Sequence, residues 1–331
     1  MKCAVIGAGS WGTAFAQILV DAGNEVFLWG RDAEVISSIN GEHRNAKFHP
    51  NSILPTGLRA TIDLAEALAD AQLVALAIPS PSVRSTLVAM KPLIAPEAFL
   101  VSLVKGVELA SMERMSEIVA EVLGVAAQRI AILTGPNLAG ELIARQPSAG
   151  VVASASATTA EMVQHAIATE YFRPYSSTDV AGCELAGAMK NVIALAVGMA
   201  VGLGMGDNTR ATVITRGLAE MARLGEALSA QAATFSGLAG LGDLVATCSS
   251  PLSRNRSFGE RLGRGATLSE ATADTKTTAE GVRTAPAILA LARAHQIEVP
   301  ITEAVVDVLA GNLTTVEAVR RLMGRSKKSE S

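Results

Sequence analysis

The chain has 331 residues, and domains usually hold about 100–200 residues, so the length predicts two domains. Apolar residues make up 49% and charged residues 18% of the chain, which excludes an intrinsically disordered protein. The formal net charge of -3 and the 3% of aromatic residues provide no global basic field and few surfaces for base stacking, so we expect no nucleic acid partner.

The cysteines, the histidines and the apolar runs indicate where in the cell the protein is expected and whether it binds a metal. Three widely spaced cysteines (Cys3, Cys183 and Cys248) are typical of a reduced cytoplasmic chain, and the four histidines lack paired ligand spacing, so we expect no metal. The N-terminus does not resemble a signal peptide. The uncharged stretch 191–206 has 16 residues, including four glycines, against the roughly 20 apolar residues of a membrane span. We expect a cytoplasmic protein without membrane insertion.

The first part of the chain alternates short β-branched runs with helical patterns, which is typical of βαβ units. This predicts an α/β fold with an N-terminal Rossmann-type, doubly wound, mostly parallel sheet in domain 1–180. A helix is expected from Thr158 to Thr169. The predicted strands are Cys3–Ile6, Glu25–Trp29, Leu73–Ile78, Phe99–Val104, Ile130–Thr134 and Gly150–Ala153.

After residue 180 the strand patterns stop, and long Ala/Leu/Met/Val runs with glycine-rich joints follow. They predict an all-helical domain over 181–324 and a flexible tail over 325–331. Long apolar helices can pair between subunits, so a homodimer is the expectation.

Residues 7–12 read GAGSWG, directly after the first predicted strand and before a helical run from Thr13 to Val20. That order places helix N-terminal amides where a pyrophosphate binds. Gly7 makes the turn, Gly9 lets phosphates approach the backbone, and Gly12 allows close helix–strand packing. Ser10 and Trp11 would lie beside the cofactor, although a glycine-rich turn without a ligand gives the same pattern.

The second strand ends in Trp29-Gly30-Arg31-Asp32. The Arg31 guanidinium suits the 2′-phosphate of NADP, whereas an NAD site places an acidic side chain against the ribose. Asp32 is suited to the ribose or to capping the next helix. The pattern predicts NADP or NAD as cofactor, with NADPH favoured; an ordinary loop arginine is the alternative.

Lys190 interrupts a helical run that is otherwise apolar on all sides. Lysine is almost never fully buried without a reason, and small residues at Ala186, Gly187 and Ala194 leave room for a ligand beside it. Burial disfavours the charged ammonium, so Lys190 is suited to exchange a proton with a carbonyl or an alcohol. The alternative is a lysine that reaches solvent from a helix edge.

Other polar positions lie at strand ends and in glycine-rich turns. Lys105 follows the fourth predicted strand, and Asn137 is expected to cap a helix that begins near Leu138. Asp243 lies in a glycine-flanked turn, and Ser253-Arg254-Asn255-Arg256 follows Pro251. The segment 251–264 holds four arginines and one acid, which is the chemistry of phosphate recognition, although a solvated helix face is the alternative.

The motifs GAGSWG, LVKG, GPNLAG, the block KNVIALAVGMAVGLGMGDNTRATVITRGLAEMARLG, TFSGLAGLGDLVATC and SRNR occur in this order. Together they closely resemble the bacterial NAD(P)-dependent sn-glycerol-3-phosphate dehydrogenases, up to about residue 320. The resemblance implies the reversible reduction of dihydroxyacetone phosphate to sn-glycerol 3-phosphate, a small phosphorylated substrate pair that feeds phospholipid biosynthesis in the cytoplasm.

The resemblance also implies roles for single residues. Lys190 resembles the proton donor and acceptor, and Lys105 resembles a lysine that touches both substrate and cofactor. The implied substrate-binding set is Lys105, Gly135, Asn137, Asp243, Ser253, Arg254 and Asn255. The implied cofactor-binding set is Gly7, Gly9, Ser10, Trp11, Gly12, Arg31, Lys105, Ala139, Arg254, Thr278 and Glu280. The chain departs from the family pattern at Asn137, Leu138 and Thr278, where the family usually has serine, phenylalanine and valine.

Two other functions stay open at this point. A Rossmann-type reductase of another small keto or hydroxy acid would share the architecture and the lysine, but it would not need the arginine-rich segment after Pro251. A non-catalytic NADP-binding protein would keep GAGSWG but has no use for a lysine inside an apolar helix.

Overall fold

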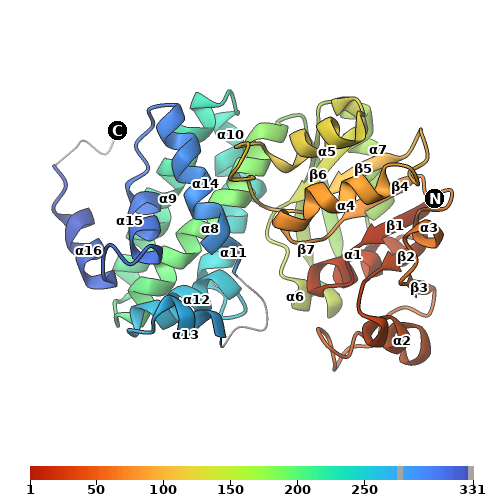
Figure 1. Ribbon diagram of the computed structural model, residues 1–331, viewed down its shortest axis with the longest axis horizontal. Helices are drawn as coiled ribbons and strands as arrows, with labels where there is room; N and C mark the ends of the chain where they lie inside the picture. The colour runs from red at the N-terminus through yellow and green to blue at the C-terminus, as the bar shows by residue number, and fades with distance from the viewer. Residues whose placement is uncertain (274–278, 327–331) are drawn as a thin grey trace. The chain divides into compact units, whose positions relative to one another are not determined.

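The computed structural model describes residues 1–273 and 279–326 (Figure 1). It divides into two compact units, one comprising Met1–Lys105 and Glu113–Glu184, the other Gly106–Met112 and the chain from Leu185 onward. The sequence analysis placed the boundary after residue 180, whereas the structure divides the chain inside helix α8 (Val180–Gly202). Residues 106–112 belong to the second unit although the chain on either side belongs to the first, and no sequence pattern predicted this.

In the described residues, eight strands of the first unit form one sheet in the order β3-β2-β1-β4-β5-β6-β7-β8. Every neighbouring pair is parallel except β6 and β7, which are antiparallel. The predicted α/β class and mostly parallel sheet are therefore confirmed. The strands are β1 (Lys2–Ile6), β2 (Glu25–Trp29), β3 (Leu58–Thr61), β4 (Leu73–Leu76), β5 (Phe99–Ser102), β6 (Ile130–Thr134), β7 (Ser148–Ser154) and β8 (Phe172–Ser177).

Alternate residues of each central strand face opposite sides of the sheet, and both sides are covered by helices. Cys3 and Val5 belong to one core cluster, whereas Ala4 and Ile6 belong to the other. The first cluster packs under α1 (Ser10–Asp21), α2 (Ala33–Glu42), α6 (Ala139–Ile143) and α7 (Ala157–Ile167). The second packs under α3 (Leu64–Leu68), α4 (Val83–Met90) and α5 (Met115–Leu123), and single 3₁₀ turns η1 (Ser80–Ser82) and η2 (Ala127–Arg129) complete the unit.

The predicted strand bounds needed correction at several ends. β4 ends at Leu76 and β5 at Ser102, both earlier than expected, and β7 begins at Ser148. Two strands were missed, β3 and β8, which are the outermost strands of the sheet. The β8 sequence FRPYSS contains a proline and alternates buried with exposed residues, which is the pattern of an edge strand rather than of a central one.

A buried carboxylate, Glu184, binds the segment with which the chain re-enters the first unit at residue 113. Glu184, 7% exposed, accepts hydrogen bonds from the Ser116 amide (2.8 Å) and hydroxyl (2.5 Å), and Arg114 pairs with it at 3.2 Å. Burial raises the pKa of Glu184, and the Arg114 guanidinium opposes that rise. The start of α5 is thereby tied to α8.

The described part of the second unit is helical, as predicted. Its elements after α8 are α9 (Asp207–Ala227), α10 (Ala232–Ser236), the π-helical turn η3 (Leu238–Gly242), α11 (Asp243–Ser249), α12 (Arg254–Gly263), α13 (Leu268–Ala273), α14 (Glu280–Ala294), α15 (Pro300–Leu309) and α16 (Thr315–Met323). Among the residues described, α8 is the one helix long and apolar enough to cross a membrane, and 83% of its most apolar window is buried inside the protein. It is therefore a core helix of this chain.

Glycines bring α8 and α12 into backbone contact. A Cβ atom at Gly198 would lie 2.0 Å from the Arg256 carbonyl oxygen, and one at Gly259 would lie 2.1 Å from the Leu195 carbonyl oxygen. Gly202 and Gly263 repeat this relation one turn further along. No larger residue fits at these positions without moving the helices apart.

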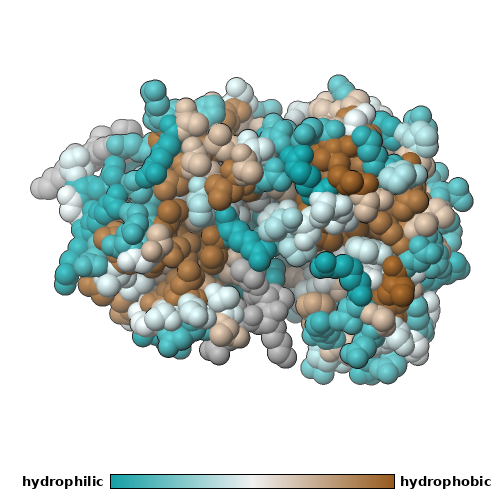
Figure 2. All heavy atoms as spheres, in the orientation of Figure 1, coloured by the Kyte–Doolittle hydropathy of each residue, from teal (hydrophilic) through white to brown (hydrophobic). Residues whose placement is uncertain are grey.

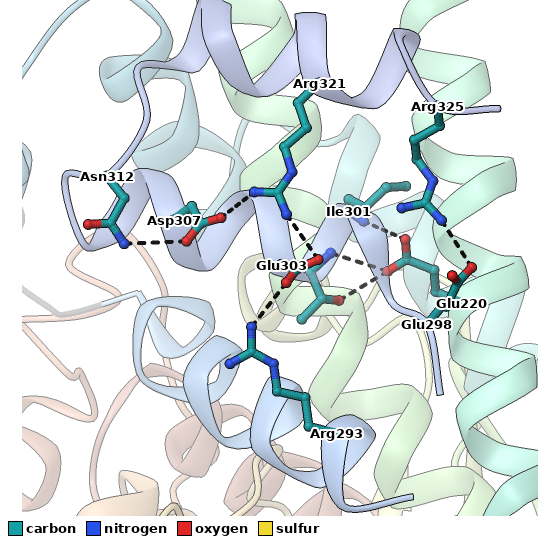
Figure 3. Close-up of polar contacts among 10 residues, drawn as sticks. Glu220, Arg293, Glu298, Ile301, Glu303, Asp307, Asn312, Arg321 and Arg325 are labelled. Carbon is teal, nitrogen blue, oxygen red and sulfur yellow. Dashed lines mark hydrogen bonds and ion pairs between the residues drawn. The ribbon is translucent and has the colours of Figure 1, made fainter. Parts of the chain in front are cut away.

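In the second unit, helix α15 is held by a buried carboxylate and a surface ion-pair network (Figure 3). Glu220 accepts hydrogen bonds from the backbone amides of Ile301 (2.5 Å) and Thr302 (3.2 Å), at the start of α15. On the outside, Arg321 bridges Glu303 at 3.1 Å and Asp307 at 2.5 Å. Elsewhere hydrophobic and hydrophilic side chains are interspersed over the face of each unit in Figure 2.

Candidate functional site

The glycine turn between β1 and α1 contains two glycines that the protein requires and one that it does not. A Cβ at Gly7 (φ +124°) would lie 2.4 Å from the Ala77 carbonyl oxygen, and one at Gly12 would lie 1.8 Å from the Gly7 carbonyl oxygen. A Cβ at Gly9 would meet no atom of the described residues within 4 Å. Packing therefore explains Gly7 and Gly12, whereas the open space at Gly9 suits a ligand that approaches the backbone.

The helix that follows is open at its N-terminus. Helix α1 begins at Ser10, and its N-cap residue Gly9 has no side chain that could cap the first turn. The buried Nε1 of Trp11 has no hydrogen-bond partner among the residues described. Open amides, the free space at Gly9 and this unused donor fit the pyrophosphate region of a dinucleotide.

At the end of β2 the structure decides between the two readings of Asp32. Its carboxylate caps α2 by accepting from the amides of Glu34 (3.2 Å) and Val35 (3.4 Å), and it pairs with Lys47 at 2.8 Å. The Lys47 ammonium holds the pKa of Asp32 below its usual range. Arg31 is exposed and has no partner among the described residues. Asp32 is thus engaged as a cap, and two cations lie next to it.

Lys105, Gly135 and Asn137 come together at the carboxyl ends of the neighbouring strands β5 and β6. The Lys105 ammonium donates to the Gly135 carbonyl oxygen at 3.1 Å. Gly135 has φ +116°, and a Cβ there would lie 3.1 Å from the Gly150 Cα, so glycine is required. The sequence prediction that Asn137 caps α6 is wrong: Leu138 is the N-cap, and Asn137 donates to the Thr134 carbonyl oxygen at 3.2 Å.

Two polar oxygens at this strand end have no partner in the described chain. They are the buried Oδ1 of Asn137 and Oγ1 of Thr134. Buried polar atoms are normally hydrogen-bonded, so atoms of this kind point to a missing polar ligand. Ala139 is the first residue of α6 and packs against the core beneath it.

In the second unit the lysine inside the apolar helix meets a buried carboxylate. The Lys190 ammonium donates to Asp243 Oδ1 at 2.5 Å and to Thr247 Oγ1 at 2.7 Å, and Thr247 Oγ1 lies 3.2 Å from the same Asp243 oxygen. Lys190 is 8% exposed and Asp243 is 1% exposed. Lys190 is therefore buried and paired, not a lysine reaching solvent from a helix edge.

The glycine-rich turn before Asp243 places that carboxylate. In η3, a Cβ at Gly240 would lie 2.2 Å from the Phe235 carbonyl oxygen, and the π-helical turn ends directly at Asp243, the first residue of α11. π-Helical turns inside helices often occur at functional sites. Burial raises the pKa of the neighbouring Cys248 thiol to about 12, so this thiol is not a nucleophile.

The residues after Pro251 divide into buried and exposed groups. Ser253 caps α12 by accepting from the Arg256 amide at 3.3 Å. Asn255 is buried, donating to Asn191 Oδ1 at 2.9 Å and accepting from the Gly281 amide at 2.8 Å. Arg254 is exposed and has no partner among the described residues, so its guanidinium is available to a ligand.

The positive charge of this segment is partly neutralised within α12. Glu260 pairs with Arg256 at 3.6 Å and also with Arg264. Glu280 is the first residue of α14 and follows the N-cap Ala279. Thr278, the remaining predicted cofactor residue, lies outside the described residues.

Three observations concern positions that the sequence did not single out. Thr247 completes the Lys190 cluster, and its place four residues after Asp243 on one helix was a usable signal. Asn191 joins Asn255 across 64 positions, for which no local pattern exists. No group of three or more metal-ligating side chains occurs among the described residues. One surface hollow is lined by residues between Gln164 and Pro174, and another by residues between Leu289 and Arg325, and neither lining includes a predicted site residue.

Comparisons with known proteins match the two parts of the chain to two family models. Residues 2–160 match the family model described as the NAD-dependent glycerol-3-phosphate dehydrogenase N-terminus, and residues 179–320 match that of the C-terminus. A Streptomyces griseus glycerol-3-phosphate dehydrogenase (NAD(P)+) is 56% identical over 330 residues, covering 100% of this chain and 98% of the relative. A relative of the same name from Corynebacterium aurimucosum is 53% identical over 328 residues, covering 99% of each chain.

A solved structure agrees as well. The crystal structure of glycerol-3-phosphate dehydrogenase from Coxiella burnetii superposes with a TM-score of 0.93 at 36% identity, covering 98% of both chains. The identities extend over both units. The chain belongs to the NAD(P)-dependent glycerol-3-phosphate dehydrogenase family.

Proposed function

We propose that this protein interconverts dihydroxyacetone phosphate and sn-glycerol 3-phosphate with NAD(P)H, and that Lys190 exchanges the proton with the C2 oxygen of the substrate. The observation that carries this proposal is the Lys190–Asp243–Thr247 cluster. Lys190 lies on an apolar helix, and its buried ammonium donates hydrogen bonds to an oxygen of Asp243 and to the hydroxyl oxygen of Thr247. Family membership supplies the substrate pair. The product would serve as the glycerol backbone of phospholipids, in the cytoplasm.

The cluster suits a proton donor for a developing alkoxide. Burial alone would favour the neutral amine, but the Asp243 carboxylate favours the ammonium, so a proton is in place before the reaction begins. Thr247 bonds to both groups and fixes the direction of the lysine side chain. In the reverse direction the amine takes the proton of the alcohol, because the same groups serve both directions of a reversible reaction.

The substrate phosphate is assigned to the start of α12. Arg254 offers a planar guanidinium with several donors in the first turn of α12, where the helix dipole also favours an anion. Ser253 and Asn255 already have partners within the protein, so we assign them to shaping this turn as well as to contact with the ligand.

The cofactor is assigned to the glycine turn and the end of β2. Gly9, Ser10 and Trp11 would hold the pyrophosphate region, and Lys105 and Ala139 would lie nearer the reacting end. When bound, NAD(P)H supplies the hydride that reduces C2. Arg31 and Lys47 add positive charge beside Asp32, whose carboxylate is occupied as a cap, so we propose a preference for NADPH.

The test is oxidation of NADPH by the purified protein with dihydroxyacetone phosphate. NADH and unphosphorylated dihydroxyacetone are the matched comparisons. We expect turnover with both cofactors, faster with NADPH at low concentration, and a loss of at least about a hundredfold in kcat/KM without the phosphate. A protein that binds NADPH but oxidises it with neither ketone would contradict the proposal and support the non-catalytic alternative.

A further inference from the structure

The segment that follows α2 folds back onto the glycine turn. Asn45 and His49 pair through an isolated β-bridge, and the His49 amide donates to the Asn45 carbonyl oxygen at 2.8 Å. The Asn45 side chain, fully buried, donates to the Ala8 carbonyl oxygen at 3.1 Å and to Thr13 Oγ1 at 2.8 Å. Asn45 therefore docks this segment against both ends of the turn.

His49 adds a contact of a different kind. Its Nε2 atom lies 3.0 Å from the Ser10 carbonyl oxygen and 3.2 Å from the Ser10 hydroxyl oxygen, and the side chain is 8% exposed. A carbonyl oxygen only accepts, so we assign the hydrogen to Nε2, which shares it between the two Ser10 oxygens in a three-centre bond. The Ser10 hydroxyl oxygen can then only accept from His49.

This assignment has a consequence for Ser10. A hydroxyl group has one hydrogen to donate, and His49 does not take it. No other partner of the Ser10 hydroxyl occurs among the described residues. Ser10 is also the first residue of α1, where the helix leaves open amides for an anion. The serine hydrogen is thus free for the same anion.

We propose that His49 is a positioning residue for the cofactor: its Nε2–H orients the Ser10 hydroxyl so that the hydroxyl donates to the pyrophosphate of the dinucleotide. The proposal rests on the assignment of Ser10 to cofactor binding. It predicts that His49 acts on affinity for the cofactor through Ser10, and not through the docking of its own segment, which Asn45 secures.

Two isosteric substitutions separate these roles. His49→Gln keeps an N–H donor near the position of Nε2, and His49→Met fills similar space without a donor. Binding of NADPH and of NADH to the full-length protein is measured without substrate, by quenching of the two tryptophans, Trp11 and Trp29, which both lie in the first unit. We expect His49→Met to raise both Kd values about tenfold and His49→Gln to raise them less than about threefold.

The same pair is then measured in a Ser10→Ala background. We expect the difference between Met and Gln to fall below about twofold there, because the hydroxyl that His49 orients is gone. Two results would overturn the proposal. One is equal Kd values for His49→Met and His49→Gln when Ser10 is retained. The other is a difference between their Kd values that is as large with Ser10→Ala as with Ser10.

Thermal unfolding of the cofactor-free variants is the control for folding. Asn45→Leu should lower Tm, whereas the His49 variants should not differ from each other. If His49→Met does not fold, His49→Asn replaces it, because its short amide cannot reach Ser10, and it should bind as weakly as expected for Met. Turnover is not used, so a protein that binds NADPH normally but fails to oxidise it would refute the proposed function without touching this result.

Discussion

Two carboxylates in the second unit are equally buried and are stabilised in opposite ways. Asp243 and Glu220 are each 1% exposed. Asp243 faces an ammonium and a hydroxyl, whereas Glu220 faces the amides at the start of α15 and the Thr302 hydroxyl (Figure 3). Asp243 is thus stabilised by the full positive charge of Lys190, whereas Glu220 is stabilised by hydrogen bonds from neutral donors.

The difference separates the region proposed to be reactive from a structural one. Burial raises the pKa of Glu220 to about 7, and the hydrogen bonds from α15 only partly oppose that rise. An isolated buried ion pair adds little stability compared with apolar residues of the same shape, so the Lys190–Asp243 pair is better explained by chemistry than by stability.

The largest expected effect comes from removing the ammonium. Lys190→Met should lower kcat by about 10³- to 10⁴-fold, because the proton donor is lost. The Kd for NADPH, measured by fluorescence titration, should stay within about twofold, since the glycine turn is untouched. A variant with undiminished turnover would remove Lys190 from the mechanism.

The same substitution tests the cost of an unpaired buried carboxylate. Lys190→Met should lower the free energy of unfolding by about 3–5 kcal/mol, because Asp243 loses its partner. The double variant Lys190→Met/Asp243→Leu should recover most of that loss while staying inactive. Urea unfolding of the three proteins measures both values, and a double variant no more stable than the single one would show that the ion pair does stabilise the fold.

Removing an exposed charge should change substrate affinity without changing stability, in contrast to removing the buried ammonium. Arg254→Ala should raise the KM for dihydroxyacetone phosphate about a hundredfold and leave Tm unchanged, because the guanidinium has no partner among the described residues. Arg264→Ala, at the other end of α12 and paired with Glu260, is the control and should leave KM unchanged. An unchanged KM in Arg254→Ala would favour a reductase of another small keto acid.

The smallest effect concerns Glu220 and pH. The folded protein keeps the Glu220 proton up to about pH 7, whereas the unfolded chain releases it near the ordinary value of 4.5. The folded state binds more protons in this window, so stability falls as pH rises from 5 to 8. The stability of the wild type relative to Glu220→Gln should therefore fall by about 2 kcal/mol over that range, measured by urea unfolding.

Glu226→Gln provides the control for this measurement. Glu226 lies on the same helix, α9, and is exposed. Its substitution should leave the pH dependence of unfolding as in the wild type. Equal slopes for wild type and Glu220→Gln would contradict the raised pKa of Glu220.

The fold could be predicted where local pattern and burial coincide. The central strands are apolar on both faces and stand out from the sequence, whereas β3 and β8 are edge strands with polar or exposed positions that resemble loops. The return of β7 as an antiparallel strand depends on the connection through α6, which no single segment encodes.

The site could be predicted where its residues are contiguous or chemically out of place. GAGSWG is a local motif, and a lysine in an apolar helix is conspicuous. The partner of that lysine is 53 positions away, and only folding shows that Asp243 is the one it meets. Asn137 was assigned to the cap because it follows a strand end, but the chain extends one residue further before α6 begins.

The glycine contacts between α8 and α12 have a consequence for which substrates fit. Lys190 stands on one of these helices and Arg254 on the other, and their backbones touch with no side chain between them. With the roles proposed above for Lys190 and Arg254, this pair of helices sets the distance between the reacting oxygen and the phosphate. A ketone with its phosphate one carbon further away should then engage only one of the two side chains, and any side chain introduced at Gly198 should change that distance.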